Sequence, residues 1–219
     1  MSTSEHSADV VKDDYGTDIY TEAESSADTL AELGPLRGLA GTWRGERGRD
    51  ISPKAEGPES TPYREEWIFE PIDPQVNGPQ LLYGLRYHQH VNRFDEKPTF
   101  HDQVGYLLWE PAAELIYMTL AIPRAQVAMA MGSATADATT FRLRAEAGHA
   151  SAGIVSNPWL DRHFHTASWE ITFTVGGPGA LSYSQTTMLD VSDLSEPFAH
   201  RDSAVLTRVA AAEPNPLAR

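Results

Sequence analysis

The stretch Gly41-Thr42-Trp43-Arg44-Gly45-Glu46-Arg47-Gly48 opens a long series of short β-rich segments. Gly41 and Gly45 leave out a side chain where neighbouring backbone must come close or the strand must bend. Trp43, between them, is large enough to fill one end of a β-barrel. We therefore expect this stretch to be the first strand of a barrel, with the later strands returning to close around it.

The rest of the chain repeats one pattern, in which short apolar and β-branched runs alternate with Gly, Pro and Asp clusters. No long helical pattern separates these runs, so parallel βαβ units are not expected. The fold class we predict is all-β: a single antiparallel, up-and-down barrel of about ten strands, which removes exposed strand edges by closing on itself. The runs predict strands near residues 41–49, 63–70, 80–91, 99–109, 114–121, 125–131, 139–146, 149–155, 163–175, 180–190 and 198–209.

The composition divides the chain into three parts. Residues 1–28 are acidic and polar and predict a disordered leader, residues 29–209 form the barrel domain, and residues 210–219 form a flexible tail. Within residues 27–39 a leucine recurs at every third position, which predicts a short helix that is broken at Gly34-Pro35 and covers one end of the barrel.

The segment 156–161 interrupts the strand pattern. Asn157-Pro158 favours a turn, and Trp159 and Leu160 supply apolar weight to dock it. Two interpretations stay open: a lid over the barrel mouth, or an ordinary packed loop.

Charge and residue usage exclude several classes of function. Seventeen Lys and Arg against 31 Asp and Glu give a net charge of −14, so binding to nucleic acid or to an anionic membrane surface is not expected. The chain has no cysteine, which excludes disulfides, iron–sulfur clusters and Cys-based zinc sites. There is no apolar run long enough for a membrane span and no secretory signal, so we expect a cytoplasmic protein.

Histidine is the residue type that points to chemistry. Strand side chains alternate between two faces, so residues two apart share a face. Four such pairs lie in predicted strands: His88 with His90, His101 with Gln103, His163 with His165, and His200 with Asp202. Only one face of a barrel strand points inward, and alternation alone does not say which of these pairs it is.

Three kinds of site compete for these residues. The pairs His88–His90 and His163–His165 have a spacing compatible with zinc, although such pairs also occur on solvated faces. A haem site needs one imidazole and an apolar cavity, and the apolar residues of the later strands could form either cavity walls or plain barrel core. A Ser-His-Asp hydrolase is not supported, because the Gly-x-Ser-x-Gly turn is missing.

Four motifs, taken in order, resemble the nitrobindins, a family of haem-binding β-barrels shaped like fatty-acid-binding proteins. They lie between about Leu36 and Val209 and are Gly41-Thr42-Trp43-Arg44-Gly45-Glu46, Tyr63-Arg64-Glu65-Glu66, Phe100-His101-Asp102-Gln103-Val104-Gly105-Tyr106, and the closing segment from Pro197 to Val209.

The resemblance implies a barrel that holds haem b, with the iron bound by a histidine of the last strand. It also implies nitric oxide binding or the isomerisation of peroxynitrite to nitrate, and whether this chain is such an enzyme stays open. On this basis we expect His200 to be the proximal, metal-binding ligand, with His101, His90 and Trp43 as further cofactor-contacting residues.

This chain departs from the family pattern at two positions. Arg47 stands where the signature has its third glycine, with Gly48 one place later, and a β-bulge could absorb the extra residue. Counting back from Val209 puts Arg201, not His200, at the ligand position, and a slip of one residue exchanges the two faces of a strand. Either the register differs by one and His200 is the ligand, or the ligand has been lost.

A second hypothesis follows from that displacement. A haem-free barrel would carry or sense a small apolar or carboxylate ligand, with Arg86, His90, His101 and His200 as polar contacts. Under the haem hypothesis, by contrast, Asp202 could orient a neighbouring imidazole, as is common for a ligating histidine. Under both hypotheses the partner is a small molecule in the barrel cavity, and the oligomeric state is left open between a single chain and a homodimer.

Overall fold

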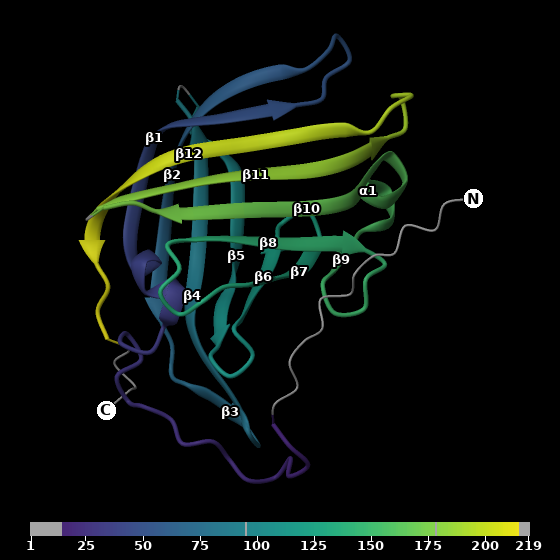
Figure 1. The fold of residues 1–219 in the computed structure, drawn as a ribbon. Helices are drawn as coiled ribbons and strands as arrows, with labels where there is room; N and C mark the ends of the chain where they lie inside the picture. The colour runs from purple at the N-terminus through teal and green to yellow at the C-terminus, as the bar shows by residue number, and fades with distance from the viewer. Residues whose placement is uncertain (1–14, 95, 178, 215–219) are drawn as a thin grey trace.

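The computed structural model describes residues 15–94, 96–177 and 179–214 (Figure 1). Predictions about residues 1–14 and 215–219 lie outside these ranges. The elements are η1 (Gly34–Leu39), β1 (Gly41–Ser52), β2 (Glu59–Pro71), β3 (Gln75–Asn77), β4 (Gln80–Arg93), β5 (Thr99–Glu110), β6 (Leu115–Ile122), β7 (Gln126–Ser133), β8 (Thr140–Ala147), β9 (Gly153–Ser156), α1 (Pro158–His163), β10 (Phe164–Val175), β11 (Ala180–Val191) and β12 (Phe198–Ala211). Neither helix is long and apolar enough to cross a membrane, and the described residues contain no other helix.

All the strands belong to one sheet that closes on itself. The sheet runs from β2 through β1, β12, β11, β10, β8, β9, β7, β6 and β5 to β4, and β2 also pairs with β4, which closes the ring. The short strand β3 pairs only with β4 among the described strands. The predicted all-β barrel of about ten strands is confirmed.

The expectation of purely antiparallel pairing is wrong at one place. β9 runs parallel to β8, with Glu146 opposite Gly153 and Ala147 opposite Ile154. In the described residues, the ladder between β7 and β8 has a single pair, Met131 opposite Arg144. β9 therefore pairs with residues 126–128, the part of β7 that β8 leaves unpaired, and so keeps the wall closed.

The predicted helix is shorter than expected. Residues 29–32 form turns, and only Gly34–Leu39 is helical, as a 3₁₀-helix. The prediction that Gly34-Pro35 breaks the helix is wrong, because these residues begin it. Proline has no backbone N–H and a fixed φ, so it suits the first turn of a helix.

The helix η1 closes one end of the barrel. Leu36 and Leu39 on the helix and Leu33 just before it are fully buried. Trp43 is also fully buried, its indole N–H donates to the Leu39 carbonyl at 2.6 Å, and the Arg208 guanidinium lies 4.6 Å above its ring. Trp43 thus fills the barrel end, as the opening motif predicts, and ties β1 and β12 to the helix.

A β-bulge in β1 absorbs the extra residue that separates Arg47 and Gly48 from the family pattern. Gly45 pairs with Glu65 and Gly48 with Tyr63, so three steps along β1 match two steps along β2. The pairing of β1 with β12 shifts over the same stretch. One extra residue reverses which side chains of a strand face inward. The bulge therefore decides which residues of β1 point into the barrel between Gly48 and the end of the strand.

The described part of the leader lies along the barrel. Residues 15–28 contain no helix or strand. Tyr15 donates a hydrogen bond to Glu110, the Ala23 amide donates to the Gly78 carbonyl at 3.0 Å, and the Ser26 amide donates to the Tyr83 hydroxyl at 2.9 Å. These contacts hold residues 15–26 against the β3–β4 side of the molecule.

Gly41 offers a test of the opening motif. Its φ is +126°, and an added Cβ would lie 2.5 Å from the Ala210 carbonyl oxygen. We expect Gly41→Ala to lower the free energy of unfolding by at least about 2 kcal/mol, from backbone strain and steric overlap. Urea unfolding would measure the loss. Gly177→Ala is the control, because nothing lies within 4 Å of its added Cβ; an equal loss in both variants would contradict the explanation.

Candidate functional site

The barrel encloses a cavity of about 570 Å³ at the end away from η1. β1 begins at η1 and ends at the cavity with Asp50 and Ser52, while β12 begins at the cavity with His200 and ends near η1. The volume is typical of small-molecule sites. Its walls combine apolar with polar side chains; the apolar ones include Val91, Phe100, Leu120, Ile122, Ile154 and Leu189.

Much of the insert at residues 156–161 lies in the helix α1 (Pro158–His163), beside the cavity. The Asn157 side chain accepts hydrogen bonds from the amides of Trp159 and Leu160, which starts the helix. Its amide group donates to the Arg124 carbonyl at 2.7 Å, and this joins α1 to the β6–β7 turn. Trp159 and Leu160 line the cavity, so the structure favours the lid over the packed loop.

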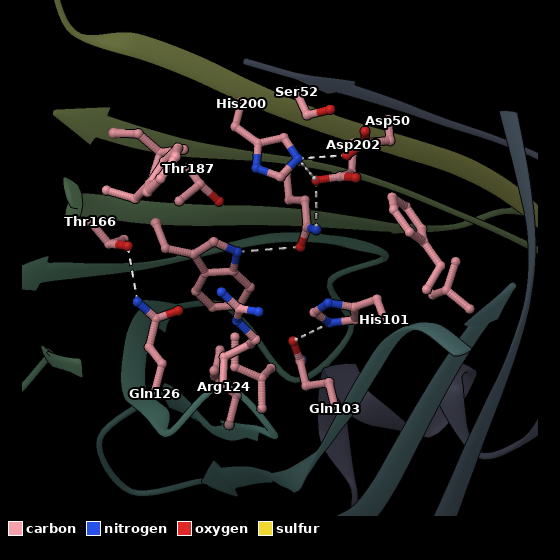
Figure 2. Close-up of a pocket in the computed structure, with 18 of the residues that line it drawn as sticks. Asp50, Ser52, His101, Gln103, Arg124, Gln126, Thr166, Thr187, His200 and Asp202 are labelled. Atoms are coloured by element: carbon pink, nitrogen blue, oxygen red, sulfur yellow. Dashed lines mark hydrogen bonds and ion pairs between the residues drawn. The ribbon is translucent and has the colours of Figure 1, made fainter. Parts of the chain in front are cut away.

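His200 and two aspartates form the centre of the polar wall (Figure 2). His200 Nε2 lies 2.6 Å from Asp50 Oδ1 and 3.6 Å from Asp202 Oδ2. Gln185 donates to Asp202 at 3.0 Å. His200 lines the cavity while Arg201 is exposed, so the register places His200 on the inward face.

The three groups shift one another's acidity. Burial alone would lower the pKa of His200, but its hydrogen bond to Asp50 and the two negative charges raise it. Burial alone would raise the pKa of Asp50, but the contact with His200 lowers it. Burial raises the pKa of Asp202 to about 6 against the attraction of His200. The cluster therefore keeps a proton on His200, shared with Asp50.

His101 also lines the cavity. A shift in the β4–β5 register at Val91 and Asn92 accompanies its turn inward with Phe100. Burial lowers the pKa of His101, with its Gln103 contact opposing the shift, so its imidazole is neutral at neutral pH.

The structure places the other predicted contacts outside this cavity. Gln89 and Val91 of β4 point into it, and His90, between them, bonds to Thr99 at 3.0 Å on the outer face. Arg86 is exposed and paired with Glu70. Trp43 lies at the plugged end. The structure thus brings together His200 and His101, but not His90, Arg86 or Trp43.

Sequence reasoning missed a buried polar network behind the cavity floor. Glu65 is 5% exposed and accepts hydrogen bonds from Trp67, Gln89 and Tyr183. The Tyr183 hydroxyl lies 2.8 Å from that of Tyr63, and both tyrosines line the cavity. Period-two alternation puts Tyr63, Glu65 and Trp67 on one face, which is the signal that could have found them.

Comparison with known proteins gives the family. A model described as the THAP4-like, heme-binding beta-barrel domain matches residues 32–208. The chain belongs to this family. The resemblance to the nitrobindins is thereby confirmed.

One solved structure adds support for the fold of this haem-binding barrel domain. Rv2717c from M. tuberculosis superposes with a TM-score of 0.58 at 22% identity, covering 84% of this chain and 99% of that one. No curated protein sequence matches the chain significantly.

The residues of the cavity fit the haem that the family name implies. The His200 imidazole projects toward the interior (Figure 2), and the carboxylate on one ring nitrogen is the usual support of a metal-binding histidine. That contact would leave Nδ1 free to bind iron. The apolar wall suits a porphyrin, and Lys54, Arg93 and Arg124, which line the cavity, would pair with its propionates.

Glu65 predicts a specific dependence of stability on pH. Burial raises its pKa from 4.5 to about 7. Between these values the folded protein holds a proton that the unfolded chain has released, so stability falls as pH rises. The loss amounts to roughly 3 kcal/mol. Glu65→Gln should remove this contribution, so that urea unfolding measured between pH 4 and 8 gives a smaller fall, to which Asp202 still contributes.

Glu66→Gln is the matched control for this prediction. Glu66 is the next residue on β2 and faces Arg44 on the outer surface. We expect its curve to follow that of the wild type. A Glu65→Gln curve parallel to the wild type would show that Glu65 titrates normally in the folded protein.

Proposed function

We propose that this barrel binds haem b in the cavity with His200 as the axial ligand of the iron, and acts on nitric oxide or peroxynitrite. The observation that carries the proposal is the inward position of His200, held by Asp50, in a cavity large enough for a cofactor. The family match supports the cofactor. The choice of ligand rests on the geometry of this chain.

Ferric haem supplies a Lewis acid that binds anionic or diatomic nitrogen species. The residues of the chain decide how such a species is held. His101, neutral and buried, and Gln103 lie on the wall across from His200 (Figure 2). His101 gives its one N–H to the Gln103 side-chain oxygen, and the Gln103 amide donates one N–H to Tyr87, so its second N–H can donate a hydrogen bond to a bound oxygen. The buried apolar wall excludes water from reactive fragments.

Cationic side chains at the cavity favour an anionic substrate. Arg124 extends from the β6–β7 turn toward the cavity (Figure 2), and Lys54 lines it from the end of β1. Arg93 lies 4.4 Å above the Phe100 ring, and both line the cavity. In a chain of net charge −14, this local positive charge would draw anions to the site.

A haem-free carrier or sensor is the second candidate. The amide side chains of Gln103, Gln126 and Gln185 all line the cavity, together with Thr166 and Thr187. So many neutral hydrogen-bonding groups suit a small carboxylate ligand. Gln126 already bonds to Thr166 at 2.9 Å, so part of this polar surface is organised without a ligand.

Haem titration of the apoprotein tests the proposal. We expect one equivalent of haem to give a Soret band in the wild type, with at least about tenfold weaker binding in His200→Ala, because the iron loses its ligand. His88→Ala is the matched control, because His88 also contacts an aspartate but lies exposed on the outer face. Stopped-flow decay of peroxynitrite then tests the activity of the loaded protein.

Each outcome separates the candidates. A wild type without a Soret band would overturn haem binding and leave the carrier. A band that survives His200→Ala but disappears in His101→Ala would move the ligand to His101. A loss in His88→Ala as large as that in His200→Ala would show that neither effect is specific to the cavity.

A further inference from the structure

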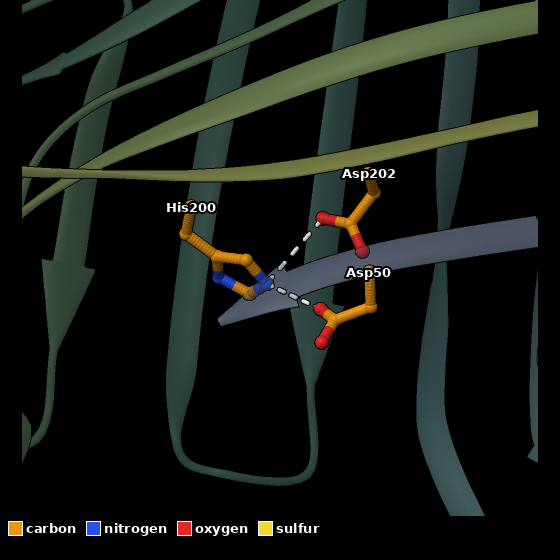
Figure 3. Close-up of side chains that lie close together, drawn as sticks. All are labelled: Asp50, His200 and Asp202. Carbon is orange, nitrogen blue, oxygen red and sulfur yellow. Dashed lines mark hydrogen bonds and ion pairs between the residues drawn. The ribbon is translucent and has the colours of Figure 1, made fainter. Parts of the chain in front are cut away.

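Asp50, His200 and Asp202 form a compact donor set on two neighbouring strands (Figure 3). Asp50 and Asp202 are paired in the ladder between β1 and β12, and His200 lies two residues before Asp202 on the same face. One donor atom from each residue lies within 4.8 Å of the other two. Such spacings are compatible with a shared metal ion.

No cationic side chain of the described residues other than His200 forms an ion pair with the two aspartates, although Lys54, Arg93 and Arg124 line the same cavity. Asp50 is 2% exposed, and its Oδ2 atom is buried without a hydrogen-bond partner. Two carboxylates and one imidazolium leave a net charge of −1 in a buried place, which is unfavourable unless a cation compensates it.

We propose that Asp50, His200 and Asp202 bind a divalent transition-metal ion of the zinc and manganese class when haem is absent. Carboxylate and imidazole ligands together suit these ions, whereas magnesium and calcium prefer all-oxygen sites. The ion replaces the proton that His200 and Asp50 share and neutralises both carboxylates. Gln185 fixes Asp202 by its hydrogen bond of 3.0 Å.

The free coordination positions of the ion face the cavity, because all three residues line it. Three protein ligands leave room for water or for an anionic ligand, as in open metal sites. This inference goes beyond haem binding and involves the same His200. The two occupants therefore compete for one imidazole, and the metal-bound form belongs to the haem-free protein.

Calorimetric titration of haem-free, chelator-treated full chain with zinc tests the proposal. We expect one zinc per chain, bound at least tenfold more weakly by Asp202→Asn and by His200→Gln. Cobalt supplies a second readout, because its absorption reports on the ligands directly. Asp102→Asn is the matched control, since Asp102 pairs with His88 on the surface, and it should bind zinc as the wild type does.

The titration separates a built site from weak binding to an acidic protein. Equal zinc affinity in the wild type and in Asp202→Asn would overturn the proposal, as would an equal loss in Asp102→Asn. The zinc affinity of Asp50→Asn is compared only if circular dichroism shows that this variant has the native fold, because Asp50 is deeply buried. The zinc measurement needs no haem, so a missing Soret band would overturn the proposed function and leave this inference standing.

Discussion

The structure depends on the pairing of β1 with β2 on one side and β12 on the other. β1 carries Trp43 at one end of the barrel and Asp50 at the other, so a single strand joins the plug to the cavity. One extra residue near Arg47 reverses the faces between these ends. Without that bulge Asp50 would point outward and His200 would lose the carboxylate that holds it.

The fold could be predicted from the sequence to a large extent, because strand runs and turn clusters are local signals. The site could be predicted only in part. Alternation put His200 and Asp202 on the same face of the last strand. It could not show whether that face points into the barrel or outward, because the sequence does not mark which residue of a barrel strand is the first to point inward. Asp50 was missed because its inward position depends on the bulge and on pairing with a strand 150 residues later. A strand near residues 149–155 was predicted, but the parallel direction of β9 was missed, because only the unpaired stretch of β7 requires it.

The two ends of the barrel divide stability from chemistry. At the closed end, leucines and Trp43 are fully buried, and most of their contribution is hydrophobic. At the open end, buried carboxylates and amides occupy positions that apolar side chains could fill at lower cost in free energy. Polar groups kept there at the expense of stability are typical of binding sites. The combination explains how one barrel can be firmly closed at one end and still carry His200 in a cavity at the other.

The link between α1 and the β6–β7 turn affects how fast a ligand can come and go. The Asn157 side chain donates a hydrogen bond to the Arg124 carbonyl, and the Asn157 backbone N–H donates one to the Ala125 carbonyl at 3.0 Å. These two bonds join α1, which covers the cavity, to the turn that carries Arg124, so an opening of α1 would displace both together. The frequency of that opening would govern entry and departure alike. A substitution at Asn157 would then change both rates in the same direction and leave the equilibrium affinity nearly constant.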